Sequence, residues 1–147
     1  MKESSMIAQT YAKNFLNRYF FQDENARRFL ETQNLHIHFP EGAVKKDGPS
    51  AGITITSAMV SLALHKPVPQ DIAMTGEISL NGKVLAIGGV KEKTMAAARE
   101  GIKKLIFPKA NEKDVAELPD YIKEGLSFHF VEEYSDVFKI LFPDIKL

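Results

Sequence analysis

The stretch Lys46-Asp47-Gly48-Pro49-Ser50-Ala51-Gly52 stands directly before a long apolar segment that reaches His65. The apolar segment carries few charges on any face, so it predicts a buried helix from Ser50 to His65. Pro67 and Pro69 follow it and prevent its continuation. Ser50 is therefore placed between small residues, at the start of a buried helix.

Helices and strands alternate on both sides of this segment. Residue patterns, with Gly101 as a stop and Asn111 as a cap, predict helices over residues 2–21, 50–65, 90–100, 111–118 and 132–142. The polar segment 23–32 is a candidate for a further short helix. Alternating or short apolar runs predict strands over residues 35–39, 71–75, 77–80, 104–107 and 127–131. Turn residues between positions 40 and 49 predict a loop.

Asn81-Gly82 marks a hairpin, because it lies between Ile78-Ser79-Leu80 and Lys83-Val84-Leu85. The Asn-Gly pair predicts a type I′ turn. Since helices and strands mix, and one strand pair is antiparallel, the predicted fold class is α/β (α+β). We expect a single domain over residues 1–147, with a mixed sheet and packed helices.

The composition excludes several classes of protein. Net charge is zero, with 19 basic and 19 acidic residues, so no basic excess indicates a nucleic-acid partner. Cysteine is absent, which excludes a disulfide framework, a cysteine nucleophile and thiolate metal ligands. No apolar run has the length of a membrane span, and we expect neither a membrane segment nor a signal peptide.

Ser50 combines the two parts that an acyl-transfer nucleophile needs. Its hydroxyl is an attacking oxygen, and backbone N–H groups beside it are donors for the oxyanion that forms. The same position suits a serine helix cap or a bound phosphate, since helix N-termini favour both. From the residues alone, Ser50 is a candidate nucleophile and a candidate anion site.

A second candidate lies in Gly88-Gly89-Val90-Lys91-Glu92-Lys93-Thr94, where a glycine pair opens a predicted helix. A lysine base must be neutral, so its pKa must fall from about 10.4 to roughly 7–8. Burial without a full counter-ion lowers the pKa in this way. Lys91 and Lys93 point to different faces, and Lys93 lies nearer the side of Val90 and Ala97. A solvated surface lysine is the alternative.

His36 and His38 lie two residues apart, on one face of a predicted strand. Such a pair could ligate a metal ion, but His65 and His129 are distant in the sequence, and no third ligand is evident. A Ser–His–Asp triad that uses Asp47 is a further alternative.

Taken together, these segments resemble the proteolytic domain of the Lon family of ATP-dependent serine proteases. The motifs that match in order are Met1-Lys2-Glu3-Ser4, His36 to Gly42, Lys46 to Gly52, Ala73 to Ile78, Gly88 to Lys93 and Pro108 to Asp114. The resemblance therefore covers nearly the whole chain. It implies the Lon proteolytic fold, in a fragment of a longer chain that lacks the first strands of that domain.

The resemblance also implies a serine endopeptidase with a Ser–Lys dyad. Its serine corresponds to Ser50 and its lysine to Lys93 rather than Lys91, and Thr75 would orient the lysine. An acyl-enzyme would form on Ser50, with backbone N–H groups holding the oxyanion. Other residues are implied to line or support the site, although each is unremarkable as a turn or strand residue: Asp47, Glu77, His36 and His38.

By the same resemblance, the whole protein would be a homohexameric ring that degrades unfolded polypeptides, both misfolded proteins and short-lived regulators. We expect a bacterial cytoplasm, or alternatively the mitochondrial matrix. Bond cleavage would need no metal or cofactor, while ATP and Mg²⁺ would act in a separate ATPase domain. This chain has no GxxxxGK[ST] phosphate loop, because Glu92 stands where that motif requires glycine before Lys93-Thr94.

Two other classes of function stay open on the sequence. One is a nonproteolytic module that binds phosphate at the Gly-Pro-Ser-Ala-Gly helix start, which would require a charged Lys93. The other is a structural, ring-forming domain that retains the site without activity.

Overall fold

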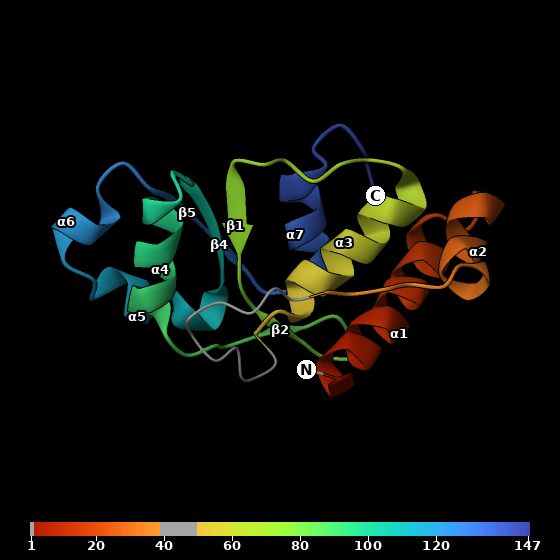
Figure 1. The fold of residues 1–147 in the computed structure, drawn as a ribbon, viewed down its shortest axis with the longest axis horizontal. Coiled ribbons are helices and arrows are strands. Elements are labelled where there is room, and N and C mark those ends of the chain that lie inside the picture. Colours follow the sequence, from red (N-terminus) through yellow and green to blue (C-terminus); the bar gives the residue numbers. More distant parts are fainter. Residues whose placement is uncertain (1, 39–49) are drawn as a thin grey trace.

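The computed structural model describes residues 2–38 and 50–147 (Figure 1). Its helices are α1 (Lys2–Tyr19), α2 (Glu24–Thr32), α3 (Gly52–Leu64), α4 (Val90–Arg99), η1 (Lys109–Asn111), α5 (Glu112–Ala116), α6 (Asp120–Lys123) and α7 (Tyr134–Leu141). Its strands are β1 (Ile72–Met74), β2 (Glu77–Ile78), β3 (Val84–Leu85), β4 (Lys104–Pro108) and β5 (Ser127–Val131).

The strands form a parallel sheet and an antiparallel hairpin. The parallel sheet has the order β1-β4-β5, and β2 pairs with β3. Helices α1, α2, α3 and α7 lie on one side of the parallel sheet, and α4, α5 and α6 lie on the other (Figure 1). The predicted α/β fold class is confirmed.

Strand β4 separates two apolar clusters. Its side chains alternate, so that Ile106 packs with residues of α1, α3 and α7, while Leu105 and Phe107 pack with residues of α4, α5 and α6. All three side chains are buried. The central strand is therefore shared by both halves of the core.

Helix α3 is the centre of the larger cluster, as its charge-poor sequence predicts. Ile53 and Val60 are fully buried in it. Helix α1 packs along α3, and its Phe15 ring meets Tyr134 and Phe138 at centroid distances of 5.1 and 5.2 Å. Aromatic packing of this kind anchors α7 to the same core.

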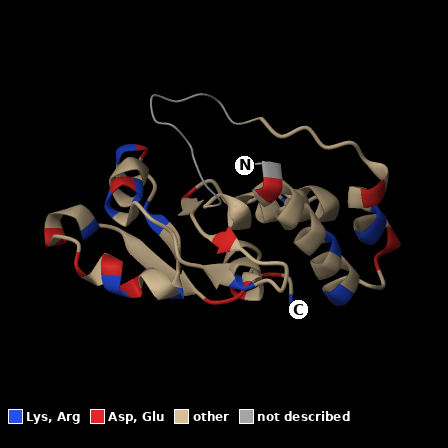
Figure 2. Cartoon of the chain, turned by 90° about the horizontal axis from the view of Figure 1, so that it is seen from below, with Lys and Arg blue, Asp and Glu red and all other residues tan. Residues whose placement is uncertain are grey.

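Charges of both signs are interspersed over the outer helices (Figure 2). Within residues 2–38 and 50–147, no helix combines the length and the apolar character that a membrane span requires.

The predicted strand at residues 35–39 is wrong over residues 35–38. Phe39 and the predicted loop from residue 40 to residue 49 lie outside the described residues. Leu35 packs against the larger cluster, but His36, Ile37 and His38 are exposed. The segment pairs with no described strand. Alternation alone does not make a strand, because a strand needs a hydrogen-bonding partner.

The hairpin at Asn81-Gly82 is confirmed, but the predicted type I′ turn is wrong. That turn needs positive φ at both central residues. Gly82 has φ +85°, whereas among the described residues His65 is the one non-glycine with positive φ. Ser79 N donates to Lys83 O, and Gly82 N donates to Ser79 O, both at 3.0 Å. The loop therefore has three residues and ends at Gly82.

The remaining helices and strands agree with the predictions to within a few residues at their ends, apart from the short helices η1 and α6 and the capping role of Asn111. Helix α6 was not predicted, because one turn is too short to carry a periodic pattern. Asn111 does stand at the start of α5, but its side chain makes no capping hydrogen bond there. The predicted capping role of that side chain is wrong.

Substitution of Gly82 is predicted to lower the stability of the fold. A Cβ at this position would lie 2.5 Å from the Tyr11 hydroxyl oxygen, in addition to the strain of φ +85°. We expect Gly82→Ala to lower the free energy of unfolding by about 2–4 kcal/mol in urea denaturation.

Gly101→Ala is the matched control. Gly101 has φ +74°, and nothing lies within 4 Å of the position that a Cβ on Gly101 would take, so only backbone strain of about 1–2 kcal/mol is expected. An equal loss of stability in both variants would contradict the role of the Tyr11 contact.

Candidate active site

Ser50 lies just before α3, and its main chain is fixed against the turn between β1 and β2. Its carbonyl oxygen accepts hydrogen bonds from Gly76 N at 2.9 Å and from Thr75 Oγ1 at 3.3 Å. Ile53 N donates to Gly76 O at 3.0 Å. The start of α3 is thus held at two points, and Ser50 itself is half-buried.

Ser50 is not the helix cap. The N-cap of α3 is Ala51, and no side-chain capping bond is made there. No described hydrogen bond thus shows Ser50 acting as a helix cap. The N–H of Ile53 is engaged with Gly76, so it is not free to serve as an oxyanion donor.

Gly52 makes this attachment possible. A Cβ on Gly52 would lie 2.7 Å from Ile78 N and 3.3 Å from Gly76 O. Any side chain would therefore push the start of α3 away from the β1–β2 turn. The glycine of the Gly-Pro-Ser-Ala-Gly stretch is needed for close backbone approach.

Thr75 joins the start of α3 to the sheet. It is buried at the end of β1, and its N–H donates to Ile106 O of β4 at 3.1 Å. Its hydroxyl donates to Ser50 O, as stated above. A threonine hydroxyl has one proton and two lone pairs, so in this arrangement Thr75 Oγ1 can only accept from a further partner.

Lys93 lies half-buried on the first turns of α4. Its Nζ donates a hydrogen bond to Gly88 O at 2.7 Å. Burial lowers the pKa of Lys93, and the nearby Glu92 carboxylate opposes this in part. None of the ion pairs among the described residues includes Lys93.

The faces of α4 agree with the sequence analysis. Val90, Thr94 and Ala97 are buried, Lys93 lies at the margin of that face, and Lys91 is exposed. Within the described part of the chain, hydrogen bonds bring Ser50 and Thr75 together, but none joins Lys93 to either residue.

Asn111 is a residue whose role sequence reasoning missed. Its side chain binds both backbone groups of Ile87, two residues before the N-cap of α4, Gly89. The sequence indicated Asn111 as a helix cap and as part of the stretch from Pro108 to Asp114 that resembles Lon, but no pattern indicated Ile87 as its partner.

No described hydrogen bond joins the other predicted site residues to Ser50, Thr75 or Lys93. Asp47 lies outside the described residues, and His36 and His38 are exposed in the segment after α2. Glu77 is half-buried in β2. In residues 2–38 and 50–147 no cluster of three or more possible ligands could hold a metal ion.

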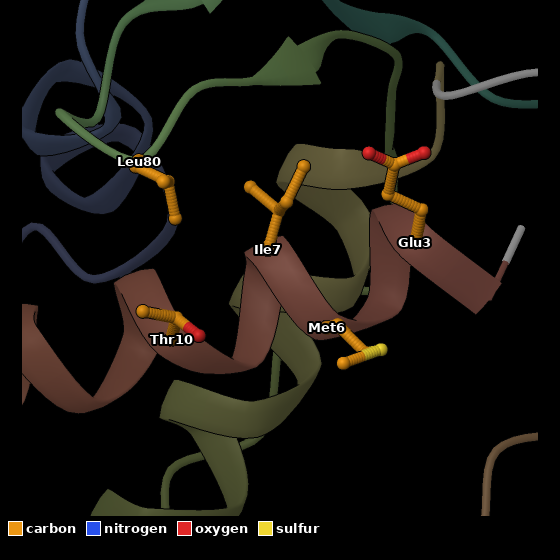
Figure 3. Close-up of a pocket in the computed structure, with 5 residues that line it drawn as sticks. All are labelled: Glu3, Met6, Ile7, Thr10 and Leu80. Atoms are coloured by element: carbon orange, nitrogen blue, oxygen red, sulfur yellow. The ribbon is translucent and has the colours of Figure 1, made fainter.

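Two hollows lie on the described surface. One, of about 570 Å³, is lined by Gly88, Gly89 and neighbouring residues of α4, and by residues at α5. Another, of about 420 Å³, lies over α1 and the hairpin and is lined by Glu3, Met6, Ile7, Thr10 and Leu80 (Figure 3). The second contains none of the predicted site residues.

Comparison with known proteins identifies the family of the chain. Residues 1–144 match the family described as Lon protease (S16) C-terminal proteolytic domain. The chain is 59% identical to a Drosophila melanogaster protein named Lon protease homolog, mitochondrial, over 145 residues, which are 99% of this chain and 14% of that protein.

Two further relatives have a similar match. A Homo sapiens protein of the same name is 52% identical over 144 residues, which are 98% of this chain and 15% of that protein. The Lon protease of Chlamydia muridarum is 52% identical over 145 residues, 99% of this chain and 17% of that protein. The chain therefore spans between 14% and 17% of the length of these relatives. It belongs to the Lon protease family and corresponds to the C-terminal proteolytic domain of that family.

Proposed function

We propose that this protease domain is a serine endopeptidase in which Ser50 is the nucleophile and Lys93 is the general base. The observation that carries the proposal is the environment of Lys93. It is half-buried, it donates to a backbone carbonyl rather than to a carboxylate, and its pKa is lowered by burial. A general base needs this environment, because only the neutral amine can accept a proton.

Other lysines of the chain provide a contrast. Lys83 and Lys109 bind the carboxylates of Glu133 and Glu112 at 2.8 and 3.0 Å, and these partners raise the pKa of each lysine. A phosphate-binding module would need Lys93 to remain charged. The backbone acceptor of Lys93 and the direction of its pKa shift support the protease alternative.

In the proposed reaction, Ser50 Oγ attacks the peptide carbonyl carbon while Lys93 Nζ takes the hydroxyl proton. The carbonyl electrons move to the oxygen, and backbone N–H groups before Ile53 are the proposed donors to that oxyanion. When the C–N bond breaks, Lys93 returns the proton to the leaving amine. A water then attacks the acyl-enzyme and loses its proton to Lys93, which reprotonates Ser50 as the acid product leaves.

The hydrogen bonds of Gly88 O and Thr75 Oγ1 fit the proposed role of the Lys93 amine as a base. A neutral amine has two N–H donors and one lone pair. One N–H is directed to Gly88 O, and Thr75 Oγ1, whose proton is given to Ser50 O, is free to accept the other. The lone pair then remains for the Ser50 proton. Thr75 would thus both orient Lys93 and support the Ser50 backbone.

The properties of the whole protein are part of the same proposal. We propose a homohexameric, ATP-dependent protease that takes in unfolded polypeptides and degrades misfolded and short-lived regulatory proteins. ATP and Mg²⁺ would act outside this chain, whose residues do not fit a phosphate loop. A bacterial cytoplasm and the mitochondrial matrix are the two proposed compartments, supported by relatives of both kinds.

The first test is the loss of each member of the dyad. We expect Ser50→Ala and Lys93→Ala each to reduce kcat for an unstructured protein substrate by more than about 10³-fold, because the two residues act as one unit. Lys93→Arg should be equally inactive, since a guanidinium stays charged and cannot serve as a base. Cleavage that survives Ser50→Ala would overturn the proposed mechanism.

The pH profile tests the protonation state of Lys93. If Lys93 is the base, kcat rises with pH as the amine loses its proton, and the rise lies below the ordinary lysine pKa of about 10.4 because burial lowers the pKa. Titration of kcat from pH 6 to 10 measures this limb. A rate that falls over the range where Lys93 deprotonates would contradict a neutral base.

Thr75 gives a third prediction. Thr75→Val keeps the shape but loses the hydroxyl, so the Ser50 carbonyl loses one donor and Lys93 loses a proposed acceptor. We expect kcat to fall about 10- to 100-fold with KM little changed, as for a small misplacement of reacting groups. Thr75→Ser should retain most activity.

Thr94→Val is the control for the loss of a buried hydroxyl. Thr94 Oγ1 donates to Val90 O within α4. Equal losses of kcat in Thr75→Val and Thr94→Val would show that the Thr75 effect is one of general packing.

A further inference from the structure

Asn111 is a buried polar residue whose side chain makes three hydrogen bonds, and only 2% of it is exposed. Its Oδ1 accepts from Ile87 N at 2.9 Å, and its Nδ2 donates to Ile87 O at 2.9 Å and to Asp114 Oδ2 at 2.8 Å. The side chain therefore pairs with Ile87 as a neighbouring strand would. It joins two segments that are 24 residues apart in the sequence.

The partners fix the orientation of the Asn111 amide. The Ile87 N–H can only donate, so Oδ1 must face it, and the Asp114 carboxylate requires an N–H donor. Reversing the amide would break these bonds. Asp114 therefore holds Asn111 in the orientation that binds both Ile87 groups.

Ile87 directly precedes the turn that anchors Lys93. Gly88 O is the acceptor for Lys93 Nζ at 2.7 Å, and Gly89 is the N-cap of α4 with φ +71°. Gly88 is exposed, and no atom lies within 4 Å of the position that a Cβ on Gly88 would take. Gly88 itself is not packed, so the turn is restrained through its neighbours: Ile87 packs against the smaller cluster and bonds Asn111, and Lys93 N donates to Gly89 O.

We propose that Asn111 is a positioning residue for the general base: through both backbone groups of Ile87, it fixes the Gly88 carbonyl to which Lys93 Nζ is anchored. This inference rests on the proposed function of Lys93. Asn111 touches neither Ser50 nor Lys93 in the described contacts, and it acts on the amine through the backbone alone.

Removal of the amide has a defined consequence. In Asn111→Ala, Ile87 loses both side-chain bonds, and the Gly88 carbonyl is free to turn towards water. Lys93 then loses a fixed acceptor and becomes more hydrated, so its pKa rises towards the ordinary value. The charged groups around the adjacent hollow are Lys91, Glu92, Asp114 and Glu117, and all four are unchanged in this variant.

The test compares Asn111→Ala with Val115→Ala. Val115 is buried on α5, near Asn111, and its truncation loses core packing without touching the Ile87 bonds. Both variants are measured for thermal stability, for kcat and KM on an unstructured protein substrate, and for the Lys93 pKa. The pKa is followed by NMR of ¹³C-labelled lysine side chains, with Lys93→Arg identifying the signal.

We expect Asn111→Ala to lower kcat about 10- to 100-fold with little change in KM, because the base is misplaced. The Lys93 pKa and the rising limb of the pH profile should both move to higher pH. Val115→Ala should lose stability but keep kcat and the Lys93 pKa. If Asn111→Ala leaves the Lys93 pKa unchanged, or if both variants change it equally, the positioning role is wrong.

Asn111→Gln keeps the test decisive if Asn111→Ala does not fold. It keeps a neutral amide and all four surrounding charges, but its extra methylene displaces the amide from the two Ile87 groups, so a smaller shift of the Lys93 pKa in the same direction is expected. An unchanged pKa in that variant overturns the proposal. A failure of the proposed function is distinguishable, since Lys93→Ala would then retain cleavage whatever Asn111→Ala does.

Discussion

The close approach of the start of α3 to the β1–β2 turn is the constraint on which the site depends. It requires the absence of a side chain at Gly52, where a Cβ would meet the backbone of Ile78 at 2.7 Å. The approach allows Ser50 O and Ile53 N to bond the two backbone groups of Gly76. The candidate nucleophile is therefore held by the main chain, so its position does not rely on a flexible side chain.

The two members of the proposed dyad belong to different halves of the core. Ser50 precedes α3 in the larger apolar cluster, whereas Lys93 is on α4, which packs in the smaller one. Strand β4 is common to both, because Ile106 faces one cluster and Leu105 and Phe107 face the other. Thr75 bonds to Ile106 O and to Ser50 O, so it connects the nucleophile to the strand between the two halves.

Sequence patterns predicted the features that depend on local chemistry. The apolar run after Ser50, the hairpin at Asn81-Gly82 and the end of α4 at Gly101 all follow from neighbouring residues. Features that depend on distant partners were missed. Residues 35–38 alternate but have no described strand beside them, and Asn111 bonds Ile87 across 24 residues. Ser50 and Lys93 were singled out by the resemblance to Lon, since spacing alone left a helix cap and a solvated lysine open.

The backbone acceptor of Lys93 would hold this residue in place in either of its protonation states. A carboxylate partner stabilises the ammonium, as Glu133 does for Lys83, and thereby raises the lysine pKa. A backbone carbonyl accepts an N–H from either form of the amine, because both the ammonium and the neutral amine are donors. Gly88 O can therefore hold Lys93 Nζ throughout a cycle in which the proton arrives and leaves. Burial lowers the Lys93 pKa while the Gly88 carbonyl holds its Nζ, so separate parts of the fold would serve the two requirements of the proposed lysine base.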